Sequence, residues 1–170
     1  MKSKKNLVLI GMMGSGKSTI GFLISKRLNI KFIDIDSVLE DVTKMKIVEI
    51  FEKKGENFFR KLEEKITLKL LNSTNNVISL GGGGFINEKI RKEVLKNNFS
   101  FWLNCDTQTL LNRIKKNQKR PIAFNLSDSE LTELIKERTK IYSKAQFEIN
   151  CHKLKKTEIV KKILKIHEHN

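Results

Sequence analysis

The chain has 170 residues, of which 39% are hydrophobic and 31% charged, and its net charge is +15. This length suits one globular domain, and a single proline with nine glycines excludes collagen-like and Pro/Gly-rich low-complexity architectures. No apolar run approaches the roughly 18 residues of a membrane-spanning helix. Two cysteines, Cys105 and Cys151, make no disulfide framework. We therefore predict a single-domain cytoplasmic protein over residues 1–170, with reduced thiols and no membrane partner.

Short apolar runs alternate with segments of helical periodicity along the chain. The elements predicted in chain order are a strand at 6–10, a helix at 17–28, a strand at 30–35, a mostly helical stretch at 38–71 broken near Lys46 and Gly55, a strand at 76–80, a helix at 88–96, a strand at 100–103, a helix at 107–116, a polar loop at 117–127, a capped helix up to Lys144, a strand at 147–150 and a C-terminal helix. Continuous apolar strands separated by helices predict a parallel sheet covered on both faces.

The basic charge could indicate nucleic acid, an acidic membrane surface or small polyanions as partners. The lysines, however, are scattered through every helical stretch, which favours biased lysine usage without functional meaning. Only six of the 34 basic residues are arginine. Because arginine offers carboxylate and phosphate a rigid bidentate fork that lysine lacks, each arginine is a better candidate for a site residue.

Residues 11–18 read G-M-M-G-S-G-K-S and match the phosphate-loop pattern G-x-x-x-x-G-K-[ST] in full. The loop follows a predicted strand and opens a predicted helix, so its backbone N–H groups and the helix dipole can cradle phosphate oxygens. Lys17 can reach the β- and γ-phosphates, and the Ser18 hydroxyl can ligate Mg²⁺. The sequence therefore predicts that the protein binds a nucleoside triphosphate. The loop alone leaves water, a nucleotide or a metabolite as the phosphoryl acceptor.

Two carboxylates, Asp34 and Asp36, end the second predicted strand. Alternation along a strand puts them on one side, about 7 Å apart, at the sheet edge where ligands bind. One could hold Mg²⁺ through water, and the other could accept the proton of an acceptor hydroxyl. The alternative is that they cap the helix that follows.

Further motifs continue in a recognisable order: G-E-x-x-F-R-x-x-E at 55–63, S-L-G-G-G at 79–83, R-P at 120–121 and E-R-x-x-x-Y at 137–142. Together with the phosphate loop and D-x-D, they span about residues 6 to 145. This combination resembles the shikimate kinase family.

The resemblance implies a three-layer α/β/α fold with a five-stranded parallel sheet in the order 2-3-1-4-5. It implies a single domain with the phosphate loop at 11–18, a substrate-binding segment at about 35–63 and a lid at about 114–125. The implied activity is ATP-dependent phosphorylation of the 3-hydroxyl of shikimate, on the route to chorismate and aromatic amino acids. The expected cofactor is Mg²⁺ with ATP as co-substrate, in a monomer that binds no nucleic acid.

The same resemblance implies roles for individual residues. Lys17, Asp36 and Arg120 are the expected catalytic residues, with Asp36 at the acceptor hydroxyl and Arg120 in the lid. Ser18 and, through water, Asp34 would hold the metal, with Ser79 nearby. The expected ATP-binding residues are Gly11, Gly14, Ser15, Gly16, Lys17, Ser18, Thr19, Arg113 and Arg120. The expected substrate-binding residues are Asp36, Phe51, Phe59, Arg60, Gly81, Gly82, Gly83 and Arg138, in which the two arginines grip the carboxylate. Core packing is an equally good interpretation of both phenylalanines.

Two departures from the family pattern concern packing rather than charge. Ile122 and Ala123 follow the R-P pair where leucines are usual, and Gly84 extends the glycine run. A gluconate or nucleotide kinase is the alternative enzyme, and a nucleic-acid-binding phosphate-loop protein is the alternative of another class. The latter depends only on the net charge, because no nucleic-acid motif or compact basic segment accompanies it.

Overall fold

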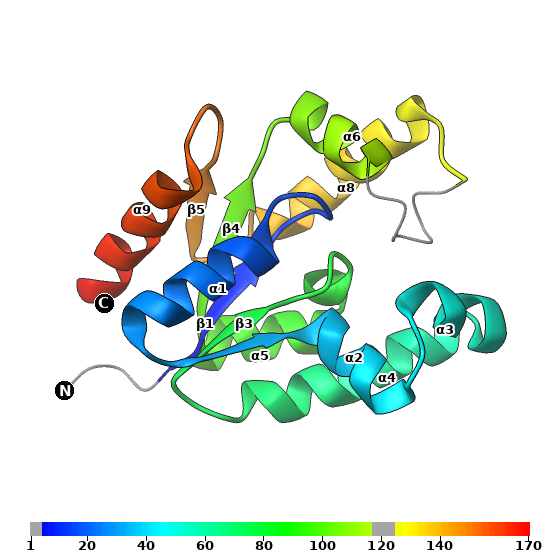
Figure 1. The fold of residues 1–170 in the computed structure, drawn as a ribbon, viewed down its shortest axis with the longest axis horizontal. Coiled ribbons are helices and arrows are strands. Elements are labelled where there is room, and N and C mark those ends of the chain that lie inside the picture. The colour runs from blue at the N-terminus through cyan, green and yellow to red at the C-terminus, as the bar shows by residue number, and fades with distance from the viewer. Residues whose placement is uncertain (1–4, 117–124) are drawn as a thin grey trace.

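The chain forms a five-stranded parallel sheet flanked by helices (Figure 1). The structure is a computed structural model that describes residues 5–116 and 125–170. The strands are β1 (Leu7–Ile10), β2 (Lys31–Asp34), β3 (Asn76–Ser79), β4 (Phe99–Asn104) and β5 (Phe147–Asn150). They lie in the order β2-β3-β1-β4-β5, with parallel neighbours throughout. The predicted fold class and strand order are confirmed.

The helices follow the predicted periodicity closely. They are α1 (Lys17–Leu28), α2 (Ile35–Thr43), α3 (Ile47–Lys54), α4 (Glu56–Leu71), α5 (Glu88–Asn97), α6 (Thr107–Lys116), α8 (Asp128–Tyr142) and α9 (Lys156–Glu168), with a 3₁₀ turn, η1 (Gly84–Ile86), after β3. The predicted breaks near Lys46 and Gly55 separate α2 from α3 and α3 from α4. The capped start of α8 is also confirmed, since Ser127 and Glu130 form a reciprocal capping box.

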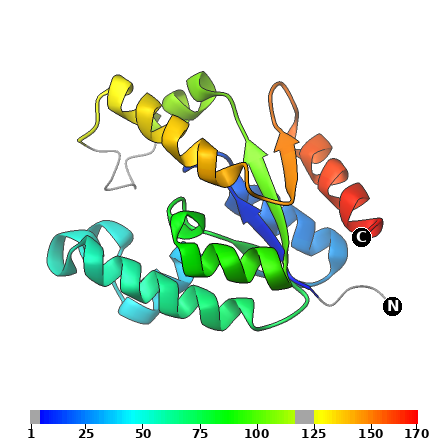
Figure 2. The same ribbon diagram turned by 180° about the vertical axis from the view of Figure 1, so that it is seen from behind.

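Alternate residues of the strands divide the core into two clusters. Leu7 and Leu9 of β1 pack in the cluster that includes residues of α1 and α9. Val8 and Ile10 pack in the cluster that includes residues of α5 and α8. Figure 1 shows α1 and α9 in front of the sheet, and the reverse view in Figure 2 shows α5 and α8 on the opposite face. Because both faces are covered, the central strand β1 is an uninterrupted apolar run in which every residue is buried. The edge strands β2 and β5 keep exposed polar residues.

The carboxyl ends of the parallel strands meet at one edge of the sheet, where ligands of such folds bind. The phosphate loop follows β1, Asp36 lies two residues beyond the end of β2, and the glycine run follows β3. At one end of the molecule, next to this edge, stands the helical group α2, α3 and α4 (Figure 1). Among the described residues, no helix combines the length and the apolar character needed to cross a membrane.

Candidate active site

The phosphate loop connects β1 to α1 in a conformation that depends on glycine. Gly14 and Gly16 have φ angles of 80° and 92°, values that residues with a Cβ atom rarely adopt. Gly16 is the N-cap of α1 and has no side chain to cap it, so the first N–H groups of the helix face the space above the loop. The Lys17 ammonium group folds back and donates to the carbonyl oxygens of Gly11 (2.8 Å) and Met12 (3.0 Å). The loop is thus shaped as an anion-binding site.

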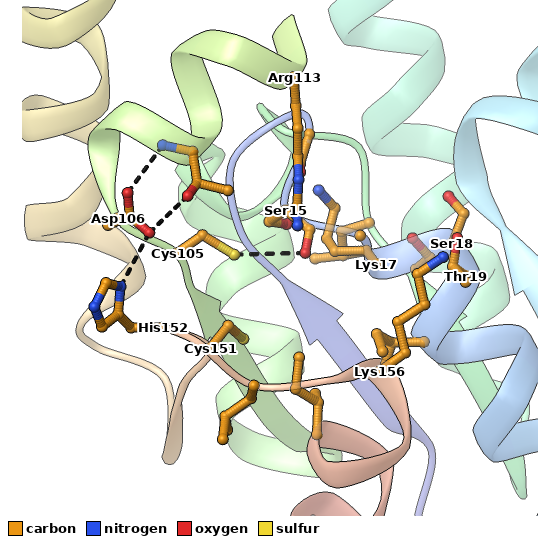
Figure 3. A pocket seen from close by; sticks show the side chains of 18 of the residues that line it. Ser15, Lys17, Ser18, Thr19, Cys105, Asp106, Arg113, Cys151, His152 and Lys156 are labelled. Carbon is orange, nitrogen blue, oxygen red and sulfur yellow. Dashed lines mark hydrogen bonds and ion pairs between the residues drawn. The ribbon is translucent and has the colours of Figure 1, made fainter.

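A cavity of about 800 Å³ opens over this loop. Of the predicted ATP-binding residues, it is lined by Gly14, Ser15, Gly16, Lys17, Ser18, Thr19 and Arg113. Figure 3 shows Arg113 extending from α6 toward the loop, where its Nη1 donates to the Gly14 carbonyl oxygen at 3.0 Å. Gly11 lies at the base of the loop and accepts from Lys17. The volume falls in the usual range for small-molecule sites, about 300–1,000 Å³.

The metal-ligand candidates Ser18 and Asp34 lie together at one side of this cavity. The Ser18 hydroxyl donates to the Asp34 carboxylate, and both residues line the cavity. Ser79 pairs with Asp34 in the register of β2 and β3 and lines the same cavity. No group of three or more His, Cys, Asp or Glu side chains able to hold a metal occurs in the described parts of the chain. A hydroxyl and one carboxylate fit Mg²⁺, which binds few protein oxygens and completes its shell with phosphates and water.

The expectation that Asp34 and Asp36 share one face of a strand is wrong. Strand β2 ends at Asp34, and Asp36 lies in the first turn of α2. The Asp34 carboxylate accepts from the backbone N–H groups of Asp36 (3.1 Å) and Ser37 (3.4 Å), so Asp34 is the N-cap. This cap stops the strand earlier than alternation suggests. Both carboxylates nevertheless line the larger cavity.

A second, much smaller cavity of about 30 Å³ adjoins Asp36. All eight predicted substrate-binding residues line it: Asp36, Phe51, Phe59, Arg60, Gly81, Gly82, Gly83 and Arg138. Asp36 also lines the larger cavity, so it borders both spaces. The rings of Phe51 and Phe59 are 4.6 Å apart between centroids and form the apolar side. Helices α2, α3, α4 and α8 and the glycine run thus contribute to one pocket.

Arg60 and Arg138 reach this pocket from different helices, α4 and α8. Arg138 is buried, with 9% of its surface exposed, and its Nη1 lies 3.7 Å from the Met12 sulfur. The Arg60 Nη1 donates to the Glu63 carboxylate at 2.7 Å, and its Nε approaches Glu56 at 3.4 Å. Two guanidinium groups from distant parts of the sequence therefore face one small space.

Glu63 is a pocket residue that the sequence interpretation did not assign. It lines the smaller cavity and is only 2% exposed. Its Oε1 has no hydrogen-bond partner among the described residues, and burial raises the pKa of its carboxyl group above the ordinary value, against the lowering effect of Arg60. The signal was present in the sequence, because Glu63 closes the G-E-x-x-F-R-x-x-E motif three residues after Arg60.

The run at 81–83 consists of glycines because charged side chains occupy the space that Cβ atoms at Gly81 and Gly83 would need. A Cβ atom on Gly81 would lie 2.7 Å from Glu63 Oε1 and 2.9 Å from Asp36 Oδ1. A Cβ atom on Gly83 would lie 2.8 Å from the Arg60 Cζ. Gly82 has more room, with its nearest neighbours at 3.4 Å. The Tyr142 hydroxyl donates to the Gly82 carbonyl oxygen and fixes the run against α8.

The lid prediction cannot be placed on the structure in full. Arg120, Ile122 and Ala123 lie outside the described residues, as does most of the predicted lid at 114–125. Of that range, Ile114 to Lys116 form the last turn of α6.

The fold and these two cavities define the class of protein. A parallel sheet with a complete phosphate loop between its first strand and helix, and a second cavity lined by charged side chains beside it, is the architecture of a P-loop kinase.

Comparisons with known proteins identify the family. The family model for shikimate kinase matches residues 13–168. Shikimate kinase from Bartonella henselae is 40% identical over 96% of this chain and 78% of its own length. Shikimate kinase from Sulfurihydrogenibium sp. is 40% identical over 94% of this chain and 96% of its own. The structure of shikimate kinase from Acinetobacter baumannii in complex with shikimate superposes with a TM-score of 0.93, at 27% identity, over 99% of this chain and 96% of that one. The chain belongs to the shikimate kinase family, as the motifs predicted.

Proposed function

We propose that this protein transfers the γ-phosphoryl group of ATP to the 3-hydroxyl of shikimate, giving 3-phosphoshikimate and ADP. The family membership supports the reaction. The observation that carries the assignment of residues is that Asp36 lines both cavities, so an acceptor in the smaller one faces a phosphate in the larger one across this carboxylate.

Arg60 and Arg138 bind the shikimate carboxylate in this proposal. Two guanidinium groups provide the planar, charge-assisted hydrogen bonds that a carboxylate prefers. The glycine run contributes backbone N–H groups, and a side chain at Gly81 or Gly83 would collide with charged groups of the site. Phe51 and Phe59 provide the apolar surface for the carbon ring. An uncharged nucleobase would not need two arginines, so the pocket suits an organic acid.

Asp36 orients the 3-hydroxyl toward the γ-phosphorus and accepts its proton in this proposal. Phosphoryl transfer passes through a loose transition state, so catalysis depends on position and on neutralising the equatorial oxygens. In this proposal Lys17 does this at the β- and γ-phosphates, with Arg120 as the second expected cation. Arg113, held against Gly14, lies beside the space for the rest of the nucleotide.

Ser18 and Asp34 would hold Mg²⁺, the Asp34 carboxylate through water. When bound, the ion would neutralise charge on the β- and γ-phosphates. We further propose that the protein acts as a cytoplasmic monomer on small molecules and does not bind nucleic acid. Gel filtration and a binding assay with duplex DNA at moderate salt test these two points.

ADP release with and without shikimate tests the activity. We expect release to depend on shikimate and to stop when EDTA removes divalent cations. Gluconate and the nucleoside monophosphates, offered in parallel, should leave ADP release at the level of ATP alone. Turnover of either alternative acceptor at the shikimate rate would refute the proposal. A mass spectrum of the product should show one added phosphate on shikimate.

A further inference from the structure

Cys105 and Cys151 lie side by side although they are distant in the sequence. Each is the first residue after its strand, β4 and β5. The strands pair in parallel with Asn104 opposite Asn150, and the backbone N–H of Cys151 donates to the Asn104 carbonyl oxygen at 2.9 Å. Paired strands lie about 4.8 Å apart. This spacing falls within the Cα separation that a disulfide requires, about 4.4–6.8 Å.

The two thiols are in contact and differ in character. Interaction with the Cys151 thiol, together with the positive charges of Arg113 and Lys17, lowers the pKa of Cys105 against burial and the Asp106 carboxylate. The Cys151 thiol itself donates to the Ile149 carbonyl oxygen at 3.3 Å. The interaction with Cys105 and burial raise the pKa of Cys151. Because the thiolate is the reactive form and cations favour it, we take Cys105, whose sulfur lies at the phosphate loop among the charges of Lys17 and Arg113, as the nucleophile and Cys151 as the resolving thiol.

Both cysteines also belong to the wall of the nucleotide cavity. They line it together and are partly exposed as free thiols. Figure 3 shows both side chains on the side of the cavity formed by the ends of β4 and β5, with the Cys105 sulfur 3.6 Å from the Ser15 carbonyl oxygen of the phosphate loop. A nucleotide held by that loop would therefore stand between the thiols and solvent.

We propose that Cys105 and Cys151 form a dithiol site that peroxides oxidise to a disulfide, and that bound nucleotide shields. No step of the phosphoryl transfer uses either thiol. The shielding rests on the proposed function only in that a nucleotide occupies the larger cavity.

The oxidation proceeds in two balanced steps. The Cys105 thiolate attacks one oxygen of hydrogen peroxide, the O–O bond breaks, and the departing hydroxide takes a proton to become water. This leaves a sulfenic acid on Cys105. The Cys151 sulfur then attacks the Cys105 sulfur, the S–O bond breaks, and the second water leaves with the Cys151 proton. Two thiols and one peroxide give one disulfide and two waters.

Peptide mapping without reductant tests the linkage directly and needs no kinase activity. After treatment with hydrogen peroxide, we expect one peptide pair joined through Cys105 and Cys151, in a protein that remains a single chain and loses the link in dithiothreitol. In Cys151→Ser, oxidation should stop at a Cys105 sulfenic acid that dimedone traps. In Cys105→Ser, Cys151 should react much more slowly. Links between separate chains only, or no linked pair in folded wild-type protein, would overturn the proposal.

Nucleotide protection tests the second part. With ADP and Mg²⁺ at about ten times the measured Kd, mass action leaves about one-tenth of the sites free, so oxidation should slow about tenfold. Shikimate alone, as the control ligand of the other pocket, should leave the rate unchanged. Equal rates with and without bound ADP would refute the shielding. If calorimetry detects no ADP binding, the proposed function fails, whereas the mapped disulfide still decides the dithiol site.

Discussion

The two cavities of the candidate active site are lined by different parts of the chain. The larger cavity, about 800 Å³, is lined by the phosphate loop, by short side chains at the strand ends and by basic side chains such as Arg113 and Lys156. The smaller one, about 30 Å³, is bounded by long charged and aromatic side chains from four helices. In it the site residues bind one another: Arg60 is paired with Glu63, and Arg138 packs on Met12. Nucleotide binding must release the Lys17 ammonium group from the loop carbonyl oxygens, whereas the acceptor must replace an ion pair between residues of its own pocket.

This difference indicates that part of the binding energy of the acceptor is used to rearrange its pocket, whereas the phosphate loop is already formed. A glycine loop between a strand and a helix is held by the sheet, so it is organised before the ligand arrives. The acceptor pocket depends on α2, α3 and α4, which stand beside the sheet edge rather than beneath it (Figure 1). We expect shikimate binding to include a shift of these helices, in the manner of induced fit. Changes in the two regions should therefore affect different kinetic constants.

The largest effect is expected from Lys17→Met in the nucleotide region. Removing the ammonium group takes away charge at the transferring phosphoryl group, so kcat should fall by about a thousandfold. The control is Lys26→Met, an exposed change on the same helix, which should leave kcat at the wild-type value. Stopped-time assays at saturating shikimate measure both. A Lys17→Met enzyme with near-normal turnover would remove this lysine from the mechanism.

In the acceptor region, the matched variants Gly83→Ala and Gly82→Ala should differ in kcat/KM for shikimate. The new methyl group on residue 83 would meet the Arg60 Cζ at 2.8 Å, whereas on residue 82 the nearest atoms lie at 3.4 Å. Because a small displacement of a positioning group can cost about a hundredfold, kcat/KM for shikimate should fall about that much in Gly83→Ala and far less in Gly82→Ala. Affinity for ADP, measured by calorimetry, should stay unchanged in both. The reverse order would contradict the geometry.

Arg60→Lys tests whether the bidentate hydrogen bonding of the guanidinium group, rather than its charge alone, binds shikimate. A lysine keeps the positive charge but loses bidentate bonding, so KM for shikimate should rise about tenfold while KM for ATP stays constant. Arg27→Lys, an exposed change on α1, serves as the control. If KM for shikimate stays at the wild-type value in Arg60→Lys, the carboxylate is bound elsewhere.

The smallest effect concerns stability, through Glu63. Burial raises the pKa of this carboxyl group in the folded state, so its contribution to stability is complete below the ordinary value of 4.5 and is lost as the pH rises through the folded-state value. The glutamine of Glu63→Gln cannot ionise, so the melting temperature of this variant relative to wild type should increase with pH above 4.5. Each kcal/mol of unfolding free energy that wild type loses should widen the difference by about 2–4 °C. Glu56→Gln, which removes the exposed partner of Arg60, should show no such trend. A difference in melting temperature between Glu63→Gln and wild type that does not change with pH would refute the raised pKa of Glu63.

Local signals explain what the sequence could predict. The phosphate loop, the Ser127 cap and the breaks at Lys46 and Gly55 each depend on a few adjacent residues, and all were placed correctly. The strand boundary at Asp34 was missed because an aspartate can end a strand or cap a helix, and the choice depends on the N–H groups that reach it. The Cys105–Cys151 pair was not foreseen, because it depends on the register of β4 and β5, which no single segment encodes. The roles of Arg60, Arg138 and Arg120 stay predictions until the variants are measured.

The position of the Asp34 carboxylate between two helices connects the nucleotide site with the acceptor site. Its carboxylate accepts from Ser18 at the start of α1 and from the first N–H groups of α2, the helix that carries Asp36. Phosphates bound at Ser18 would therefore act on the same carboxylate that caps the helix carrying Asp36. The two substrates should assist one another, and by thermodynamic reciprocity the factor by which nucleotide tightens shikimate must equal the factor by which shikimate tightens nucleotide.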